Sequence, residues 1–207
     1  MASGLLNVVG EHMNGLQIAG IANITASKLN GVQIALCNYA TQARGLQIGL
    51  VNYYKEDMKG FQLGLVNANP DTRVQMMVYG GNATPVNIGV RFKNQLFYTI
   101  LGVGSMYQGL NDKFSASASY RAGLSFTLYK GLSISGDLGY QHIEAFDNKD
   151  EVIPKRLYAL QARANLEYQF TRKFGIYATG GYGLTRFYNK SSNYDKGAII
   201  EAGIVLF

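Results

Sequence analysis

The chain has 207 residues, of which 47% are hydrophobic and only 15% are charged, and its formal net charge is +6. The apolar residues are dispersed, and the lack of any run of about 18 of them excludes a transmembrane helix. The lysines and arginines are scattered without a basic run or an RNA-binding motif, which argues against nucleic acid as a partner.

The N-terminal segment, MASGLLNVVG, lacks the basic and apolar parts of a secretory signal peptide. Within it, GLLN at residues 4–7 matches the second half of a repeat that follows, so the chain begins inside a repeat. We therefore expect the natural protein to carry a signal sequence and further repeats upstream.

Residues 15–67 hold four copies of a repeat of about 15 residues: GLQIAGIAN, GVQIALCN, GLQIGLVN and GFQLGLVN. The copies begin at Gly15, Gly31, Gly45 and Gly60 and end at Asn23, Asn38, Asn52 and Asn67. A further column, two residues before each glycine, contains Met13, Leu29, Ala43 and Met58. Identical turns in every copy favour a short parallel β-solenoid, whose coils are equivalent, over four additional strands of an antiparallel barrel.

Two residue types inside these repeats bear on function. The Asn and Gln columns are expected to satisfy backbone groups at the turns rather than to bind a ligand. Cys37, the single cysteine, cannot form an internal disulfide, and we expect it to be a small core residue.

From Val74 onward the repeat is lost and eight strand-like segments follow. They cover residues 74–82, 85–93, 95–105, 114–129, 132–146, 156–171, 174–188 and 198–207. Several alternate strictly: between Phe114 and Tyr129, apolar residues at even numbers oppose small or polar residues at odd numbers. Such a period of two predicts strands, and their length fits a wall between lipid and a polar interior.

The connections between these segments also alternate. Those at residues 93–94, 129–131 and 171–173 are tight, whereas those at 107–113, 147–155 and 189–196 are long and polar. Residues 82–85 form a short link where a long loop is expected. Short turns on one rim and long loops on the other are typical of outer-membrane barrels.

The last strand, GAIIEAGIVLF, ends on Phe207 and resembles the C-terminal strand signal of bacterial outer-membrane proteins, although Val205 replaces a second aromatic. Together with the GLQIGLVN-type repeats, the chain resembles the surface-repeat outer-membrane proteins of Gram-negative bacteria. The repeats carry this resemblance over residues 4–67 and the barrel over residues 74–207. It implies that the assembly machinery reads Phe207 and that no defined catalytic residue is present.

Charged residues on the polar faces form the candidate site. Arg121, Asp137, Arg163, Glu167 and Glu201 stand on different strands, and charges inside a narrow barrel must pair or stay hydrated. We predict an internal salt-bridge network that holds an eight-stranded lumen closed. A constriction for a small polar solute is the alternative role for these residues.

The sequence offers little support for a catalytic site. His142 and Glu144 share the lipid-facing side near a rim, where some outer-membrane lipid hydrolases keep a catalytic histidine, but no serine stands in a nucleophile context. We interpret the pair as an interfacial rim position. Neither His12 nor His142 has metal-ligand spacing to another ligand type.

We therefore predict an all-β chain in which 15-residue repeats occupy residues 1–72 and an antiparallel transmembrane β-barrel of about eight strands occupies residues 73–207. The expected role is a non-catalytic structural or surface-interaction role in the bacterial outer membrane, without a cofactor. Expected partners are outer-membrane lipid, the barrel-assembly machinery, and a surface partner or glycan. A narrow passive channel is the alternative function if the repeats widen the barrel to 12 strands.

Overall fold

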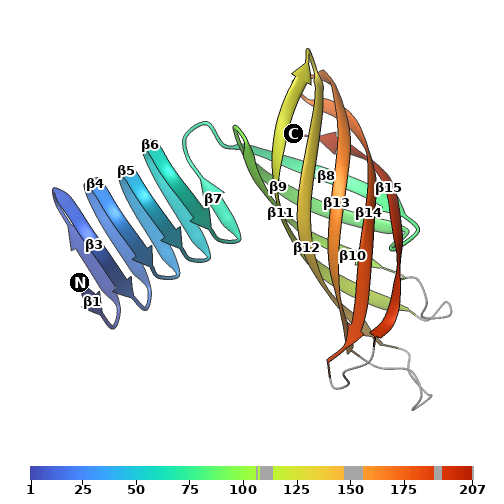
Figure 1. Cartoon of the computed structure of the whole chain (residues 1–207), viewed down its shortest axis with the longest axis horizontal. Helices are drawn as coiled ribbons and strands as arrows, with labels where there is room; N and C mark the ends of the chain where they lie inside the picture. The colour runs from blue at the N-terminus through green and yellow to red at the C-terminus, as the bar shows by residue number, and fades with distance from the viewer. Residues whose placement is uncertain (106, 108–113, 147–155, 189–192, 207) are drawn as a thin grey trace. The chain divides into compact units, whose positions relative to one another are not determined.

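The structure, a computed structural model, describes residues 1–105, 107, 114–146, 156–188 and 193–206. It divides into two compact units, Met1–Arg73 and Val74–Phe207. Every element of secondary structure within the described ranges is a β-strand (Figure 1). Among these residues there is no helix long and apolar enough to cross a membrane.

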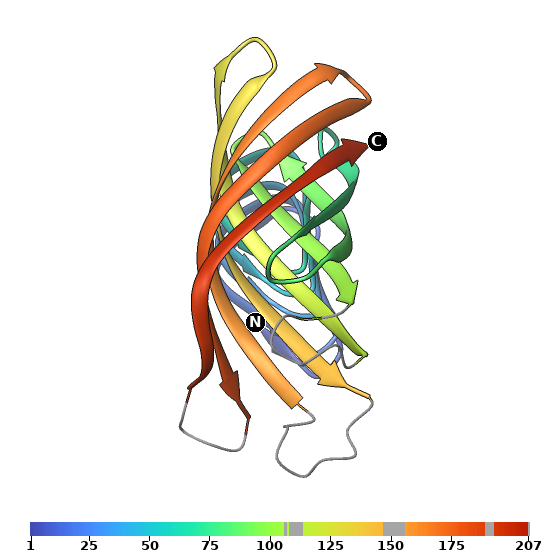
Figure 2. The same cartoon turned by 90° about the vertical axis from the view of Figure 1, so that its right-hand side faces the viewer.

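The second unit is a closed eight-stranded barrel (Figure 2). Its strands are β8 (Arg73–Gly81), β9 (Val86–Asn94), β10 (Phe97–Ser105), β11 (Ser115–Tyr129), β12 (Leu132–Ala145), β13 (Arg156–Thr171), β14 (Phe174–Phe187) and β15 (Asn193–Leu206). Consecutive strands from β9 to β15 pair antiparallel, and β15 pairs antiparallel with β8 to close the sheet. The predicted fold class, an all-β protein with an antiparallel barrel of about eight strands, is confirmed.

The alternation that predicts these strands corresponds to two environments. In β11, Ser117, Arg121 and Ser125 are buried, whereas Leu124 and Phe126 are exposed on the outside. The last strand was predicted to begin at Ala198, but β15 begins at Asn193. Residues 193–196, expected in a loop, are polar yet continue the ladder with β14, because backbone pairing does not depend on side-chain polarity.

The first unit is a stack of parallel coils. Its strands are β1 (Ala2–Ser3), β2 (Leu6–Val9), β3 (His12–Ala19), β4 (Ala22–Ile34), β5 (Cys37–Ile48), β6 (Val51–Leu63) and β7 (Val66–Ala68). All their pairings are parallel, and the opening glycines and closing asparagines of the repeats are in register. The solenoid prediction is confirmed. The alternative prediction, that the repeats add four strands to give a 12-stranded barrel, is wrong because the repeat strands pair with one another.

The glycine that opens each repeat is required by the backbone. Gly31 and Gly45 have φ of 143° and 132°, a region that side chains rarely adopt. A Cβ on Gly31 would lie 1.9 Å from the carbonyl oxygen of Gly15, and one on Gly45 would lie 2.0 Å from that of Gly31. The glycine column therefore allows successive coils to approach closely.

Amide side chains fill one part of the solenoid interior. Asn23 Nδ2 donates to Asn38 Oδ1 at 3.0 Å, and Asn38 Nδ2 donates to Asn52 Oδ1 at 2.9 Å. A parallel ladder joins Gln17, Gln33, Gln47 and Gln62 through bonds of 2.8, 2.9 and 2.8 Å. The asparagines also satisfy the turns, since Asn38 Nδ2 lies 2.8 Å from the carbonyl oxygen of Ile48.

Cys37 differs from its prediction as a core residue, because its side chain is exposed. It is in register with Ala22 and Val51, next to the inward-facing asparagine column. Since successive side chains of a strand point to opposite faces, the residue before each buried asparagine must point outward.

Candidate functional site: the barrel interior

A bidentate ion pair lies in the middle of the barrel interior. Arg121 on β11 donates from Nε and Nη2 to the two carboxylate oxygens of Asp137 on β12, each at 2.8 Å. Asn165 on β13 donates to Asp137 Oδ2 at 2.8 Å, and the Tyr98 hydroxyl donates to the same oxygen at 2.8 Å. Arg121 is only 1% exposed, so this charge depends on its protein partners for solvation.

A second pair extends this group toward β15. Arg163 contacts Glu201 through Nε and Nη2, each at 3.2 Å. Glu201 Oε2 also lies 3.9 Å from Arg121 Nη1, which links the two pairs. Because β11 and β15 are not neighbours in the sheet, this contact crosses the lumen.

Glu167 pairs outside the group formed by Arg121, Asp137, Arg163 and Glu201. Arg91 on β9 reaches across the barrel and binds both oxygens of Glu167, at 2.6 and 3.0 Å. Gln75 accepts from Arg91 Nε and Nη2 at 2.9 and 2.7 Å. Arg91 was not among the predicted site residues, although its place on the polar face of an alternating strand was a signal for it.

The structure thus places all five predicted residues, Arg121, Asp137, Arg163, Glu167 and Glu201, in the interior, and Arg91 with them. Three buried arginines face three buried carboxylates, so the fully buried charges of the described residues balance. Charge-assisted, bidentate pairs of this kind hold both groups in fixed positions.

Apolar clusters lie toward both ends of the barrel interior, and Arg91 and Glu167 are in register with Ile100 and Tyr177 of the first one. Met77, Tyr79, Tyr98, Ile100, Tyr177 and Val205 form one, on strand segments near the two-residue turns. Tyr107, Ile143, Ala145, Leu157 and Ala159 form the other, near the long connections. An eight-stranded barrel has room only for its own side chains. The two clusters and the ion pairs of the described residues agree with this limit.

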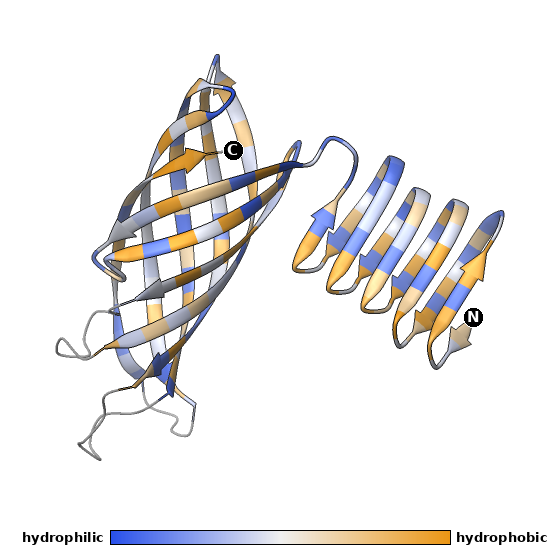
Figure 3. Cartoon of the chain, turned by 180° about the vertical axis from the view of Figure 1, so that it is seen from behind, coloured by the Kyte–Doolittle hydropathy of each residue, from blue (hydrophilic) through white to orange (hydrophobic). Residues whose placement is uncertain are grey.

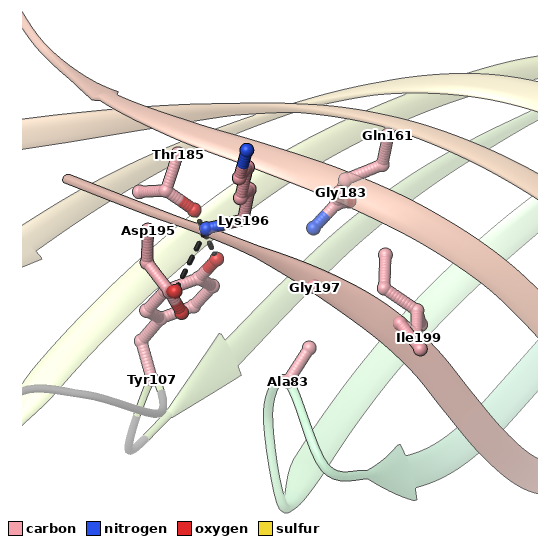
Figure 4. A pocket seen from close by; sticks show the side chains of 10 residues that line it. Ala83, Tyr107, Gln161, Gly183, Thr185, Asp195, Lys196, Gly197 and Ile199 are labelled. Atoms are coloured by element: carbon pink, nitrogen blue, oxygen red, sulfur yellow. Dashed lines mark hydrogen bonds between the residues drawn. The ribbon is translucent and has the colours of Figure 1, made fainter. Parts of the chain in front are cut away.

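A small cavity of about 50 Å³ remains beside Tyr107 and Thr185 (Figure 4). The two hydroxyl oxygens are 2.6 Å apart and share a hydrogen bond. Burial raises the pKa of the Tyr107 hydroxyl, so it stays protonated. At about 10–15 Å³ for each water, the cavity has space for a few waters.

His142 lies on the outside, as the sequence predicts. Its Nδ1 lies 2.7 Å from the Tyr188 hydroxyl, and its Nε2 lies 3.5 Å from Glu144 Oε2. Glu144 in turn accepts from Arg156 Nε at 3.0 Å. The rings of Tyr140, Tyr158 and Tyr188 pack beside the histidine. Both ring nitrogens thus have partners, in a group of aromatic side chains typical of a membrane interface.

Within the described ranges, no group of three or more His, Cys, Asp or Glu side chains could hold a metal ion. Phe207, the predicted assembly signal, lies outside the described residues.

No protein-family model matches the sequence, and a comparison with curated proteins also found no match. Solved structures are similar in fold at low identity. A de novo designed transmembrane β-barrel is 16% identical, covering 66% of this chain and 95% of its own, with a TM-score of 0.43. The N-terminal β-barrel domain of Pseudomonas aeruginosa OprF is 16% identical, covering 64% of this chain and 93% of its own, with a TM-score of 0.40. Neisserial surface protein A is 10% identical, covering 64% of this chain and 94% of its own, with a TM-score of 0.42. These structural neighbours are β-barrel proteins of the membrane.

Proposed function

We propose that this protein is a non-catalytic β-barrel of the bacterial outer membrane that anchors its repeat unit to that membrane. The barrel itself supports the location. Its strands β11 to β15 have 14 to 16 residues, with apolar side chains outside and charged side chains inside. Such a wall is stable when lipid contacts the outside, because every strand is paired and no edge is left open.

Membrane insertion is tested by flotation of the full chain with lipid vesicles after refolding in their presence. The proposal predicts that the protein floats with the vesicles and resists extraction by alkaline carbonate. A soluble ligand-binding barrel would stay in the dense fractions, and that result would contradict the proposal.

The filled interior carries the non-channel part of this proposal. Arg91–Glu167 and Arg121–Glu201 cross the lumen, and apolar clusters lie toward both ends of the barrel. We expect no discrete current steps when the protein is reconstituted in planar bilayers at neutral pH. Reproducible single-channel openings would show that the charged layer is a constriction and not a closure.

The strand connections bear on which side of the membrane the repeats join. Two residues separate Asn94 from Phe97, Tyr129 from Leu132 and Thr171 from Phe174, and β8 begins at this same rim, beside the end of β15. Short turns face the periplasm in bacterial outer-membrane barrels. We therefore propose that the link from the repeats reaches the periplasmic rim, in place of the surface position expected from the resemblance.

Assembly is a separate part of the proposal. The C-terminal segment with Phe207 serves as the signal for the barrel-assembly machinery. Phe207→Ala should lower the amount of folded barrel in the outer membrane of an expressing bacterium without lowering refolding in detergent. Equal loss in both settings would indicate a structural role for this residue.

A further inference from the structure

Each coil of the solenoid has an arc without charge. The four segments 15–23, 31–38, 45–52 and 60–67 contain no Asp, Glu, Lys, Arg or His. Their only polar side chains are glutamines and asparagines, and all of these are buried. The exposed side chains on these arcs are instead large and apolar, and include Leu16, Ile18, Leu36, Leu50, Phe61 and Leu63. Phe61 is 72% exposed, an unusual state for an aromatic residue in water.

The opposite arc of each coil has the reverse arrangement. Lys28, Lys55, Glu56 and Asp57 stand at or near its turns and are charged. Its interior is apolar except for Thr25: Leu29, Ala40 and Ala43 are fully buried, with Met13 and Met58 beside them. In Figure 3 the turns of the charge-free arcs are orange at one edge of the stack, and the opposite edge carries blue and pale residues. The solenoid is thus polar outside and apolar inside at one edge, and apolar outside and polar inside at the other.

Most polar groups of the apolar edge are satisfied from within, and Gln17 Nε2 is the buried exception, without a hydrogen-bond partner among the described residues. The asparagine ladder accepts and donates between coils and also donates to carbonyl oxygens at the turns, as from Asn23 to Ile34 at 3.0 Å. Gln33 Nε2 crosses the coil to the carbonyl oxygen of Tyr39 at 3.2 Å. Internal satisfaction of this kind is what a backbone requires where water is absent.

The boundary between the arcs carries residues typical of a lipid headgroup region. Tyr39 and Tyr53 directly follow the asparagine column, and their rings stack with centroids 5.8 Å apart. On the other strand of the coil, Arg44 and Lys59 directly precede the glycine column and are exposed. Tyrosine and basic residues are enriched at this depth because their tips are polar and their stems apolar.

We propose that the apolar edge of the solenoid inserts into one leaflet of the membrane that holds the barrel. From the boundary glycine to the turn, four residues at about 3.3 Å each reach about 13 Å, close to half of a hydrocarbon core of about 30 Å. The occupant is lipid rather than a second copy, because apolar side chains stand on both strands of the flattened coil and on its turn. A bilayer surrounds all three surfaces at once, whereas a flat protein contact covers one.

Chain connectivity agrees with this inference, which rests on the proposed membrane location of the barrel. Only residues 69–72 separate β7 from β8. At about 3.5 Å for each Cα step, five steps span at most about 17 Å. The end of the solenoid cannot leave the neighbourhood of the membrane, so its insertion loses little further translational freedom.

The test uses Cys37, whose exposed thiol lies on the apolar arc, as the attachment point for an environment-sensitive fluorophore. The labelled full chain is refolded into vesicles of phosphatidylethanolamine and phosphatidylglycerol. A nitroxide on the lipid acyl chain should lower its fluorescence at least about twofold, and aqueous iodide should have little effect. The matched control, C37S with E56C, places the label on the charged arc, where iodide should quench it and the nitroxide should not.

A second variant tests the apolar edge itself. Leu50→Glu adds a charge to an exposed turn side chain, so it should leave the coil folded and abolish acyl-chain quenching of the Cys37 label, whereas Leu50→Met should preserve it. The inference is overturned if the Cys37 label is open to iodide in vesicles that float with the protein. It is also overturned if neither quencher reaches the label, because protein then covers the edge. Failure to float contradicts the proposed function and this inference together.

Discussion

The two units bury polar side chains in different chemical forms. The barrel interior combines amides with full charges, as in the Arg121–Asp137 pair, whereas the buried polar side chains described in the solenoid are all neutral, as in the Asn38–Asn52 contact. In the barrel each interior position has a different neighbour on each side, so an arginine on one strand can face a carboxylate on another. In the solenoid each residue stacks on its equivalent in the next coil, about 4.8 Å away.

Where identical side chains lie above one another in successive coils, only side chains that can bond to their own kind are stable. Identical charges at that spacing repel in a medium of low dielectric constant. An amide both donates and accepts, so asparagine bonds to asparagine and glutamine to glutamine without limit. The comparison teaches that repetition, and not burial alone, decides whether an interior can be ionic. The predictions below probe this difference, beginning with the largest effect.

Removal of a carboxylate from the barrel network should have the largest effect. Asp137→Ala leaves the Arg121 guanidinium buried without its bidentate partner, and we expect a loss of about 3–5 kcal/mol in the free energy of unfolding. Urea unfolding of the vesicle-bound protein, followed by tyrosine fluorescence because the chain has no tryptophan, measures this loss. An unchanged unfolding midpoint would show that water reaches Arg121.

A charge placed inside the amide ladder should cost nearly as much. Asn38→Asp removes donors to Asn52 Oδ1 and to the Ile48 carbonyl and buries a carboxylate among acceptors. We expect about 3 kcal/mol of destabilisation, confined to the solenoid. Tryptic cleavage at Arg44 should accelerate. Asn30→Asp is the matched control, because Asn30 bonds to Asn14 on the exposed outer face. Equal cleavage of both variants would argue against the ladder as a source of stability.

Adding one methyl group between two coils should disturb their close approach and destabilise the solenoid. Gly45→Ala forces a side chain into a positive φ and toward the Gly31 carbonyl, so we expect a loss of about 2 kcal/mol, again seen as faster proteolysis. Gly10→Ala adds the same group where nothing lies within 4 Å. Its cleavage rate should stay at that of the parent protein, and a rate matching that of Gly45→Ala would remove the coil-spacing argument.

The exposed ion pair on the barrel surface should matter least. Glu144→Ala breaks the contacts with Arg156 and His142, which lie near the rim and remain partly open to solvent. Surface pairs contribute less than about 1 kcal/mol, so the unfolding midpoint should move little. A loss comparable to that of Asp137→Ala would show that the charged rim, and not the interior, stabilises the barrel.

The sequence predicts the strands well because both units have a strict period. Alternation from Phe114 to Tyr129 predicts β11 to within one residue, and the column of asparagines predicts the parallel register from Asn23 to Asn67. Turn chemistry that recurs in every copy separates a solenoid from a meander, in which successive turns lie on opposite edges.

The sequence does not reveal in the same way which side chains pair across the lumen. Which arginine meets which carboxylate depends on the stagger and tilt of the closed sheet, so Arg91 was overlooked as the partner of Glu167. The exposed position of Cys37 was missed for a related reason. An apolar run suggests a core in water, but the repeats place their apolar side chains outward around a ladder of amides.

The glycine column has one more consequence, for how such a chain can change over generations. Since each coil offers the next one the same carbonyls, amides and open φ positions, duplication of a single repeat needs no compensating substitution elsewhere. Each new copy would lengthen the stack by about 4.8 Å. Copy number is therefore a dimension that selection can adjust in equal steps while the barrel stays unaltered.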